Sequence, residues 1–313
     1  MSNHEPRHQT LSFLQQRFAE VGIEPRTRHG QNFLIDLNLV RLLVESAQLG
    51  PSDIVLEVGT GTGSLTGLLA DRAAEVITVE LDARMHQLAS EELFGRQNVT
   101  LLLKDALRNK NHLDPELLAL LAERLAARRG AALKLVANLP YNVATPIISN
   151  LLACGTPPTT MTVTIQKELA ERITAEPGTK DYGALTIWIQ SQCRAQLVRL
   201  LPPGVFWPRP KVTSAILHIE RDDVRRAAIG DLDFIHSFVR ALFTHRRKFL
   251  RSVLIAAHKE TLGKAGVDAV LAELDLAPEL RAEQLDVPTI LELSRTVQRH
   301  LLAGAAAGER GEA

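Results

Sequence analysis

Short apolar runs alternate with amphipathic stretches over the first two thirds of the chain. Runs rich in aliphatic and β-branched residues, short enough to be buried strands, are Asp53 to Val58, Glu75 to Glu80, Asn98 to Leu103, Leu133 to Ala137 and Met161 to Ile165. Helical periodicity lies between them, over Ser64 to Arg72, Ala83 to Phe94 and Ala144 to Leu152. Nearly continuous apolar strands separated by helices are typical of a parallel sheet that is covered on both faces. The pattern therefore predicts an α/β fold.

The pattern changes after Gln192. Two further segments, Gln196 to Leu201 and Val212 to Glu220, predict antiparallel strands with a Pro-rich turn between them. From about Asp231 the apolar residues recur only at helical spacing, which predicts a small all-α domain. Residues 107–130 are interpreted as a helical insertion between two strands.

These patterns predict four parts of the chain. They are an N-terminal lead (1–29), an α/β domain (30–225), a helical domain (226–302) and a flexible tail rich in Ala and Gly (303–313).

The composition is that of an ordinary globular protein. Of 313 residues, 45% are hydrophobic and 23% are charged, which excludes a disordered or fibrous chain. The sequence contains no apolar run of membrane-spanning length and no signal-peptide core at its start, so we expect a cytoplasmic protein. Cys154 and Cys193 are too few for a disulfide framework or a zinc site, and we expect no metal.

The overall charge balance hides a local excess of basic residues. The chain has 36 basic and 36 acidic residues, yet Arg240 to Arg251 contains five basic residues and no acidic one. Such a run is more often a solvated helix face than a nucleic-acid site, until another feature supports binding.

The clearest chemical motif is the glycine loop GTGTG, from Gly59 to Gly63, at the end of a predicted strand. Ser64 stands where a dinucleotide-binding fingerprint has its third glycine, which disfavours NAD. Glu57, just before the loop, suits a ligand with a cationic amino group. Glu80 and Asp105 end the next two strands, where they could bind ribose hydroxyls and an adenine edge. Each could simply cap an element, but together they predict a nucleoside site.

A second motif, Asn138-Leu139-Pro140-Tyr141, follows the fourth predicted strand. The Asn138 side-chain oxygen and a backbone carbonyl can accept hydrogen bonds from an exocyclic amine, and the Tyr141 ring can stack on its base. The proline ends the strand, so the motif could also be only a strand-terminating turn.

In order and spacing, these and other motifs resemble the rRNA adenine N6,N6-dimethyltransferases over about Arg26 to Leu301. The matching motifs begin at Gly30 (GQNFL), Glu57 (EVGTGTG), Glu80 (ELD), Asp105 (DA), Asn138 (NLPYN), Gln166 (QKE), Tyr182 (YG), Phe206 (FWPRPKV) and Arg246 (RRK). The resemblance implies a Rossmann-like class I methyltransferase domain with a small C-terminal all-α domain. It also implies dimethylation of two adjacent adenosines in small-subunit (16S) rRNA by a monomer, with S-adenosylmethionine, in a preribosomal particle.

The resemblance further implies roles for individual residues. Cofactor contacts would fall on Asn32, Leu34, Gly59, Glu80, Asp105 and Asn138. The catalytic group would be Asn138, Leu139, Pro140 and Tyr141, and the target adenine would stack between Tyr141 and Phe206. With such a site present, RNA phosphates are the expected partners of Arg246, Arg247, Lys248 and Arg251.

Three alternatives remain open at this point. One is the related large-subunit enzyme that confers macrolide resistance, which usually has Ile where this chain has Leu139. Another is a mainly non-catalytic ribosome-assembly or transcription factor on the same fold. A small-molecule methyltransferase would explain the glycine loop but would leave the NLPY motif and the basic run without a purpose.

Overall fold

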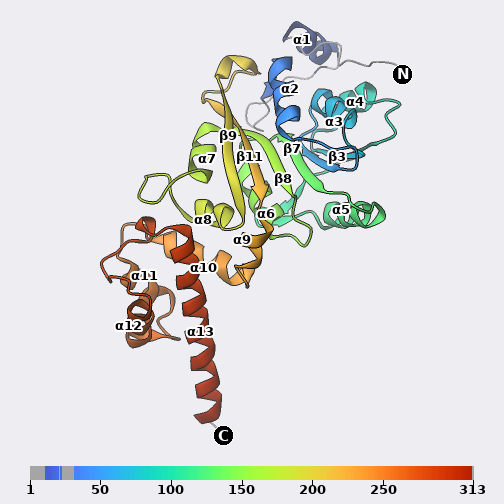
Figure 1. Ribbon diagram of the computed structural model, residues 1–313. Coiled ribbons are helices and arrows are strands. Elements are labelled where there is room, and N and C mark those ends of the chain that lie inside the picture. Colours follow the sequence, from blue (N-terminus) through green and yellow to red (C-terminus); the bar gives the residue numbers. More distant parts are fainter. Residues whose placement is uncertain (1–10, 21, 23–31, 312–313) are drawn as a thin grey trace. The chain divides into compact units, whose positions relative to one another are not determined.

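The computed structural model describes residues 11–20, 22 and 32–311 (Figure 1). It has two compact units, Met1–Ala170 with Ala195–Arg221, and Glu171–Arg194 with Asp222–Ala313. Residues 171–194 thus group with the C-terminal helices, while the sequence pattern placed them in the α/β domain. Most of the predicted lead lies outside the described residues, as do Gly30 and Gln31 of the GQNFL motif.

Seven strands form one sheet in the order β4–β3–β2–β7–β8–β11–β9. They are β2 (Ile54–Val58), β3 (Glu75–Glu80), β4 (Val99–Leu103), β7 (Leu133–Asn138), β8 (Thr160–Gln166), β9 (Cys193–Leu201) and β11 (Ser214–Arg221). Neighbours from β4 to β8 are parallel, and β11 is antiparallel to β8. The five predicted parallel strands are confirmed to within one residue at each end, and the later strands extend the sheet as expected.

Burial explains why these segments are strands. Every residue of β2 is buried, and Ile54, Val55 and Leu56 have no exposed surface. Helices flank the sheet (Figure 1), namely α2 (Leu37–Ser46), α3 (Ser64–Ala70), α4 (Ala83–Glu92), α5 (Pro115–Ala127) and α6 (Ala144–Ala153). The α4 helix begins at an N-cap, Asp82, whose carboxylate accepts from the N–H groups of its first turn.

Residues 107–130 contain the predicted helix between two strands, but they are a regular connection of the sheet and not an insertion. They form a small hairpin of β5 (Leu107–Asn109) and β6 (His112–Leu113), followed by α5. Strands β4 and β7 are separated in the sheet by β3 and β2, and parallel strands need a long crossover between them. The segment is that crossover.

A short ladder lies beside the sheet. β1 (Phe33–Leu34) pairs antiparallel with β10 (Phe206–Trp207), just after the short 3-10 helix η2 (Pro203–Val205). A further helix, α1 (Leu11–Glu20), precedes it within the predicted lead.

The second unit is helical, as predicted. Its elements are α8 (Ala184–Gln190), α9 (Asp223–Ala227), α10 (Leu232–Thr244), α11 (Leu250–Ala257), α12 (Gly263–Glu273), η3 (Ala282–Gln284) and α13 (Val287–Gly311), while α7 (Lys167–Ile173) crosses from one unit to the other. The Tyr182 hydroxyl, which is buried, donates to the Leu285 carbonyl at 2.8 Å and so ties α8's N-terminal turn to η3.

Most residues of the predicted tail belong to α13, which continues to Gly311. Its alanine-rich sequence explains this, since alanine has the highest helix propensity. Across residues 11–20, 22 and 32–311, none of the helices is both long and apolar enough to cross a membrane.

Candidate functional site

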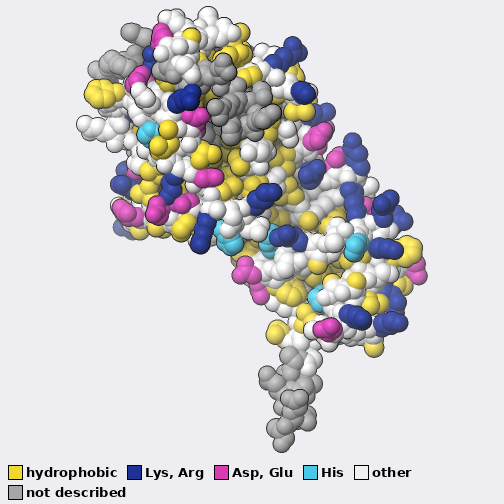
Figure 2. Space-filling view, turned by 180° about the vertical axis from the view of Figure 1, so that it is seen from behind, with side chains coloured by type: hydrophobic (Ala, Val, Ile, Leu, Met, Phe, Trp, Pro, Cys, Tyr) yellow, Lys and Arg dark blue, Asp and Glu magenta, His cyan; other side chains and the backbone are white. Residues whose placement is uncertain are grey.

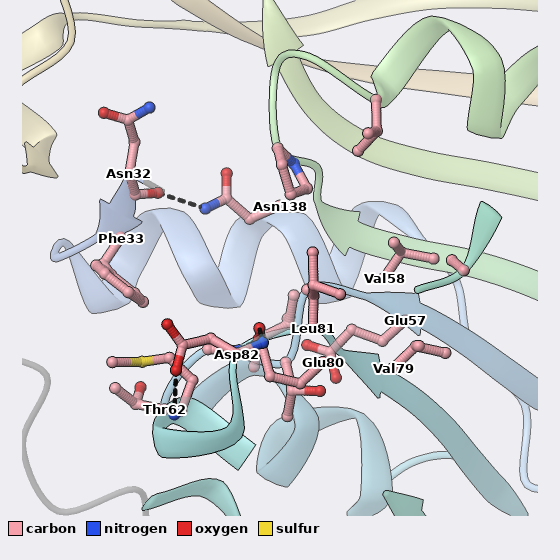
Figure 3. Close-up of a pocket in the computed structure, with 18 of the residues that line it drawn as sticks. Asn32, Phe33, Glu57, Val58, Thr62, Val79, Glu80, Leu81, Asp82 and Asn138 are labelled. Carbon is pink, nitrogen blue, oxygen red and sulfur yellow. Dashed lines mark hydrogen bonds between the residues drawn. The ribbon is translucent and has the colours of Figure 1, made fainter. Parts of the chain in front are cut away.

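One cavity of about 360 Å³ opens at the carboxyl ends of β2, β3, β4 and β7 (Figure 3). Open α/β sheets bind their ligands at this edge. The six residues predicted to contact a cofactor all line the cavity: Asn32, Leu34, Gly59, Glu80, Asp105 and Asn138. Asn32 and Asn138 lie on one side, and Glu80 and Asp82 lie on the other (Figure 3). The fold therefore gathers residues from four strand ends and from the N-terminal segment.

The glycine loop forms the floor between β2 and α3. Gly59 has a φ of +89°, and Gly61 has a φ of +57°, a region that side chains with a Cβ rarely adopt. A Cβ on Gly61 would lie 3.1 Å from Cε1 of Phe33, and one on Gly59 would lie 3.4 Å from Cδ of Pro140. The glycines thus allow both the turn and the close approach of the two walls.

Glu80, at the end of β3, is held by backbone donors. Its Oε2 accepts from the Gly61 N–H at 2.9 Å, and its Oε1 accepts from the Asp82 N–H at 2.9 Å. The residue is 7% exposed, and burial raises its pKa although these bonds oppose the shift. Each oxygen retains a lone pair, so the carboxylate is preorganised to accept hydrogen bonds from a ligand such as a ribose.

Glu57, on β2, is fully buried and lines the same cavity. The hydroxyls of Thr66 and Thr78 both donate to its Oε2, at 2.6 and 2.7 Å. Its Oε1 has no hydrogen-bond partner among the described residues. Desolvation raises the pKa of Glu57 to about 8, and the charge of Glu80 adds to the rise. A buried acceptor without a partner is costly, so this atom is suited to a donor on a ligand.

Asp105 lies at the exposed rim of the cavity, after β4. Its Oδ1 accepts from the Leu107 N–H at 2.9 Å, which fixes the carboxylate. The neighbouring Lys104 is engaged by Asp114 at 2.5 Å and Glu116 at 2.7 Å. The Asp105 side chain thus lines the cavity where it can accept a hydrogen bond from a donor such as an adenine amine.

Asn138 ends β7 with a defined orientation. Its Nδ2 donates to the backbone carbonyl of Asn32 at 2.8 Å (Figure 3). A carbonyl can only accept, so this bond assigns the nitrogen and oxygen of the amide. The oxygen, Oδ1, is consequently the atom that can accept hydrogen bonds from a substrate.

The rest of the NLPY motif is anchored to neighbouring strands. Leu139 is buried, and its N–H donates to the Thr164 carbonyl at 3.1 Å. Pro140 lines the cavity. Tyr141 follows Pro140, is half-buried and is not among the residues that line the cavity, and its hydroxyl hydrogen-bonds the Ser214 hydroxyl of β11. That bond holds the ring, and burial raises the pKa of Tyr141.

The prediction that Phe206 stacks on a substrate base disagrees with the structure. Phe206 is 2% exposed and packs in a core cluster with Leu34, Val40 and Leu43. Its pairing with Leu34 in the β1–β10 ladder points the ring into the protein. In this conformation its faces are covered by side chains, so no base can stack on them.

The basic run of the second unit also divides in an unexpected way. The Arg246 side chain binds residues of its own unit. It pairs with the carboxylate of Glu283 and donates to the carbonyls of Thr179 and Lys180. Arg251 forms a two-pronged ion pair with Asp268, at 2.6 and 2.9 Å. These two arginines therefore stabilise the helical unit.

Arg247 and Lys248, in contrast, are exposed in the turn between α10 and α11. Within the described part of the chain, no hydrogen bond or ion pair engages their side chains. On the face seen in Figure 2, Lys and Arg side chains are spread over the surface with acidic side chains among them. The RNA-binding role of the run remains a prediction for these two residues.

Several lining residues were not assigned from the sequence. They are Phe33, Thr62, Leu81, Asp82, Met85 and Ala106. Leu81 and Asp82 stand directly after Glu80, and Ala106 stands directly after Asp105. Their position at strand ends was the sequence signal that could have predicted them as lining residues. Phe33 stands between Asn32 and Leu34 in the GQNFL motif, which was its signal, whereas Met85 carried none, because its place in the cavity wall depends on tertiary packing.

Comparison with known proteins gives one family. The family model described as "Ribosomal RNA adenine dimethylase" matches residues 23–295. Among curated relatives named "Ribosomal RNA small subunit methyltransferase A", the protein of Moorella thermoacetica is 37% identical over 281 residues, covering 89% of this chain and 94% of the relative. That of Geobacillus kaustophilus is 38% identical over 271 residues, covering 86% and 89%.

Two solved structures of methyl-transferring enzymes have a fold similar to that of this chain. A dimethyladenosine transferase from Plasmodium falciparum superposes with a TM-score of 0.71 and 25% identity, covering 85% of this chain and 97% of the other. The 23S rRNA methyltransferase ErmE gives a TM-score of 0.58 at 25% identity, covering 85% and 99%. The strand order and these neighbours identify the fold as that of the class I methyltransferases.

Proposed function

Because the chain belongs to the ribosomal RNA adenine dimethylase family, we propose that it dimethylates the N6 amines of two adjacent adenosines in small-subunit (16S) rRNA during small-subunit assembly, with S-adenosylmethionine as methyl donor. The relatives' names support the choice of RNA. The observation that carries the proposal is the orientation of Asn138, whose Oδ1 is left as an acceptor at the edge of the cavity.

The cavity fits this cofactor. The unpartnered Oε1 of Glu57 suits the cationic amino group of its methionine part. Glu80 can accept from the ribose hydroxyls, and Asp105 can accept from the adenine amine. When bound, the cofactor supplies an electrophilic methyl group on a sulfonium centre.

Catalysis by this chain rests on orientation. The lone pair of an adenine N6 amine is delocalised into the ring, so the amine is a weak nucleophile. Asn138 Oδ1 and the Leu139 carbonyl would accept the two amine hydrogens and turn the nitrogen lone pair toward the methyl group. The Leu139–Thr164 hydrogen bond keeps this backbone fixed on β8. Such positioning supplies several kcal/mol without a covalent intermediate.

Tyr141 would receive the target base. A base must leave its stack to reach the cavity, at a cost of a few kcal/mol that stacking on an aromatic ring offsets. The bond between Tyr141 and Ser214 holds the ring before the base arrives. Phosphate contacts would come from Arg247 and Lys248, with the chain acting as a monomer on a preribosomal particle.

The large-subunit alternative has weaker support. The dimethyladenosine transferase is structurally more similar than the 23S enzyme, with TM-scores of 0.71 and 0.58. The Leu139 position points the same way, because the large-subunit enzymes usually have Ile there.

Transfer of tritiated methyl groups to purified immature small subunits tests the proposal. We expect four methyl groups per particle, two on each adenosine, and none on large subunits. The Tyr141→Ala variant serves as the matched control for background. Labelling of large subunits instead, or labelling that stops at one methyl group per adenosine, would overturn this assignment.

A further inference from the structure

Helix α1 buries one face against the cofactor-binding end of the first unit. Leu14 has no exposed surface and Phe18 is 1% exposed, although both belong to a ten-residue N-terminal helix. They share one hydrophobic cluster with three residues from elsewhere in the fold, Phe33, Met85 and Leu88. The helix is therefore packed as a part of the unit's core.

Polar contacts tie α1 to α4, but they do not explain its packing. Arg17 pairs with Glu91 of α4 at 2.8 Å, and Arg84 of α4 donates to the Gly22 carbonyl at 3.1 Å. The first is an exposed ion pair and the second is an exposed hydrogen bond to a residue that follows α1, and such surface contacts contribute little to stability. The buried cluster is consequently the main attachment of α1.

The cluster is also a wall of the cavity. Phe33 and Met85 belong to both, so the same two side chains face α1 and the cavity. The Phe18 ring meets the Phe33 ring edge-on, with centroids 5.2 Å apart and an interplanar angle of 75°. This is a favourable aromatic geometry that fixes the Phe33 ring.

Phe33 in turn borders the glycine loop, which is hydrogen-bonded to Glu80. A Cβ on Gly61 would lie 3.1 Å from Phe33, so the ring lies directly against the loop. The Gly61 N–H then donates to Glu80 Oε2 at 2.9 Å. Phe18 thus contacts Phe33, and Phe33 contacts Gly61. The hydrogen bond from Gly61 then reaches Glu80, the carboxylate proposed to bind the ligand.

We propose that Phe18 is a positioning residue for the cofactor: it holds Phe33 against the glycine loop, so that α1 is part of the binding site without touching the ligand. This inference rests on the proposed use of S-adenosylmethionine. It predicts that removing the Phe18 ring weakens cofactor affinity, while the rate of the methyl-transfer step, which depends on Asn138, does not change.

Three variants test the inference: Phe18→Ala, the conservative Phe18→Leu, and Phe94→Ala as matched control. Phe94 is 91% exposed just after α4, so its loss removes an equally large ring that packs on little. We expect Phe18→Ala to raise the Kd and KM for S-adenosylmethionine by about tenfold, as for a typical coupling between sites. The kcat at saturating cofactor should stay within about twofold. Phe18→Leu, which keeps an apolar contact but no ring, should recover only part of the affinity and keep a Kd measurably above that of wild type, and Phe94→Ala should match wild type.

The alternative is that α1 only adds stability. In that case Phe18→Ala would melt at a lower temperature but bind the cofactor with unchanged Kd, and the inference would be overturned. If Phe18→Ala does not fold, Phe18→Leu decides, because a Kd equal to wild type also overturns it. A wild-type protein that does not bind the cofactor would refute the proposed function instead.

Discussion

Glu57 is a carboxyl group that folding places in an unfavourable environment for its charge. Its pKa rises from 4.5 to about 8, mainly through desolvation, and the neighbouring charge of Glu80 contributes. Between these values the folded protein holds a proton that the unfolded chain releases. The contribution of Glu57 to stability is therefore complete below about pH 4.5 and is lost as the pH rises through about 8.

We accordingly expect the ligand-free protein to become less stable from pH 5 to pH 8. The slope due to Glu57 should approach 1.4 kcal/mol per pH unit, roughly the value for one proton. In Glu57→Gln the free energy of unfolding should change less over this range, whereas the exposed control Glu92→Gln should follow wild type. Urea unfolding at four pH values measures this, and parallel curves for all three proteins would contradict the assignment.

Glu80 should govern cofactor affinity. Glu80→Ala removes the charge-assisted bonds to the ligand and the acceptor for the Gly61 and Asp82 N–H groups. We expect binding to weaken by about 1.5 to 3 kcal/mol. Isothermal titration with S-adenosylmethionine measures the loss, with Glu92→Ala as control. A folded Glu80→Ala protein that binds S-adenosylmethionine with wild-type affinity would show that Glu80 does not contribute to cofactor binding.

At the scale of elements, the turn between α10 and α11 separates two kinds of basic residue. Arg247→Ala with Lys248→Ala should reduce the log–log salt slope of particle binding by about 1.4 to 1.8 units if both side chains meet phosphates. Stability should be unchanged, because both side chains are exposed. An unaltered slope would show that these two side chains contact no phosphate and that the turn is an ordinary solvated surface.

Arg246→Ala should behave in the opposite way. It removes the ion pair with Glu283 and the bonds to the carbonyls of Thr179 and Lys180. We expect a loss of about 1 to 3 kcal/mol in the free energy of unfolding. Denaturant unfolding of both variants makes the comparison, and a fully stable Arg246→Ala protein would contradict the structural role.

The strands were predictable because their apolar runs are short and bounded by loops. Strand ends then located Glu80, Asp105 and Asn138, since parallel strands bring their carboxyl ends to one edge. The partners of side chains were not predictable. Phe206 was expected to stack on the target adenine, yet its ring is packed in the core beside the β1–β10 ladder. Arg246 was expected to bind phosphate, yet it is engaged by residues distant in sequence.

For the whole molecule, charge balance limits how RNA can be bound. The 36 basic and 36 acidic residues cancel, and ion pairs occupy arginines such as Arg246 and Arg251. Affinity for a folded rRNA surface would then come from local groups of cations, such as Arg247 and Lys248, and from the fit of the protein to the RNA shape. This charge balance fits our proposal that the protein acts on a particle and not on any available RNA.

The central claim is that Asn138 orients the adenine amine, and single-turnover methyl transfer tests it most directly. Immature small subunits, saturating S-adenosylmethionine and excess enzyme isolate the chemical step for wild type and Asn138→Ala. The account predicts a rate lower by about 10² to 10³-fold, as for loss of a preorganised hydrogen-bonding group in an active site. Particle binding should persist, because the proposed phosphate contacts, Arg247 and Lys248, lie elsewhere in the chain. A rate for Asn138→Ala within a few-fold of wild type would contradict the account.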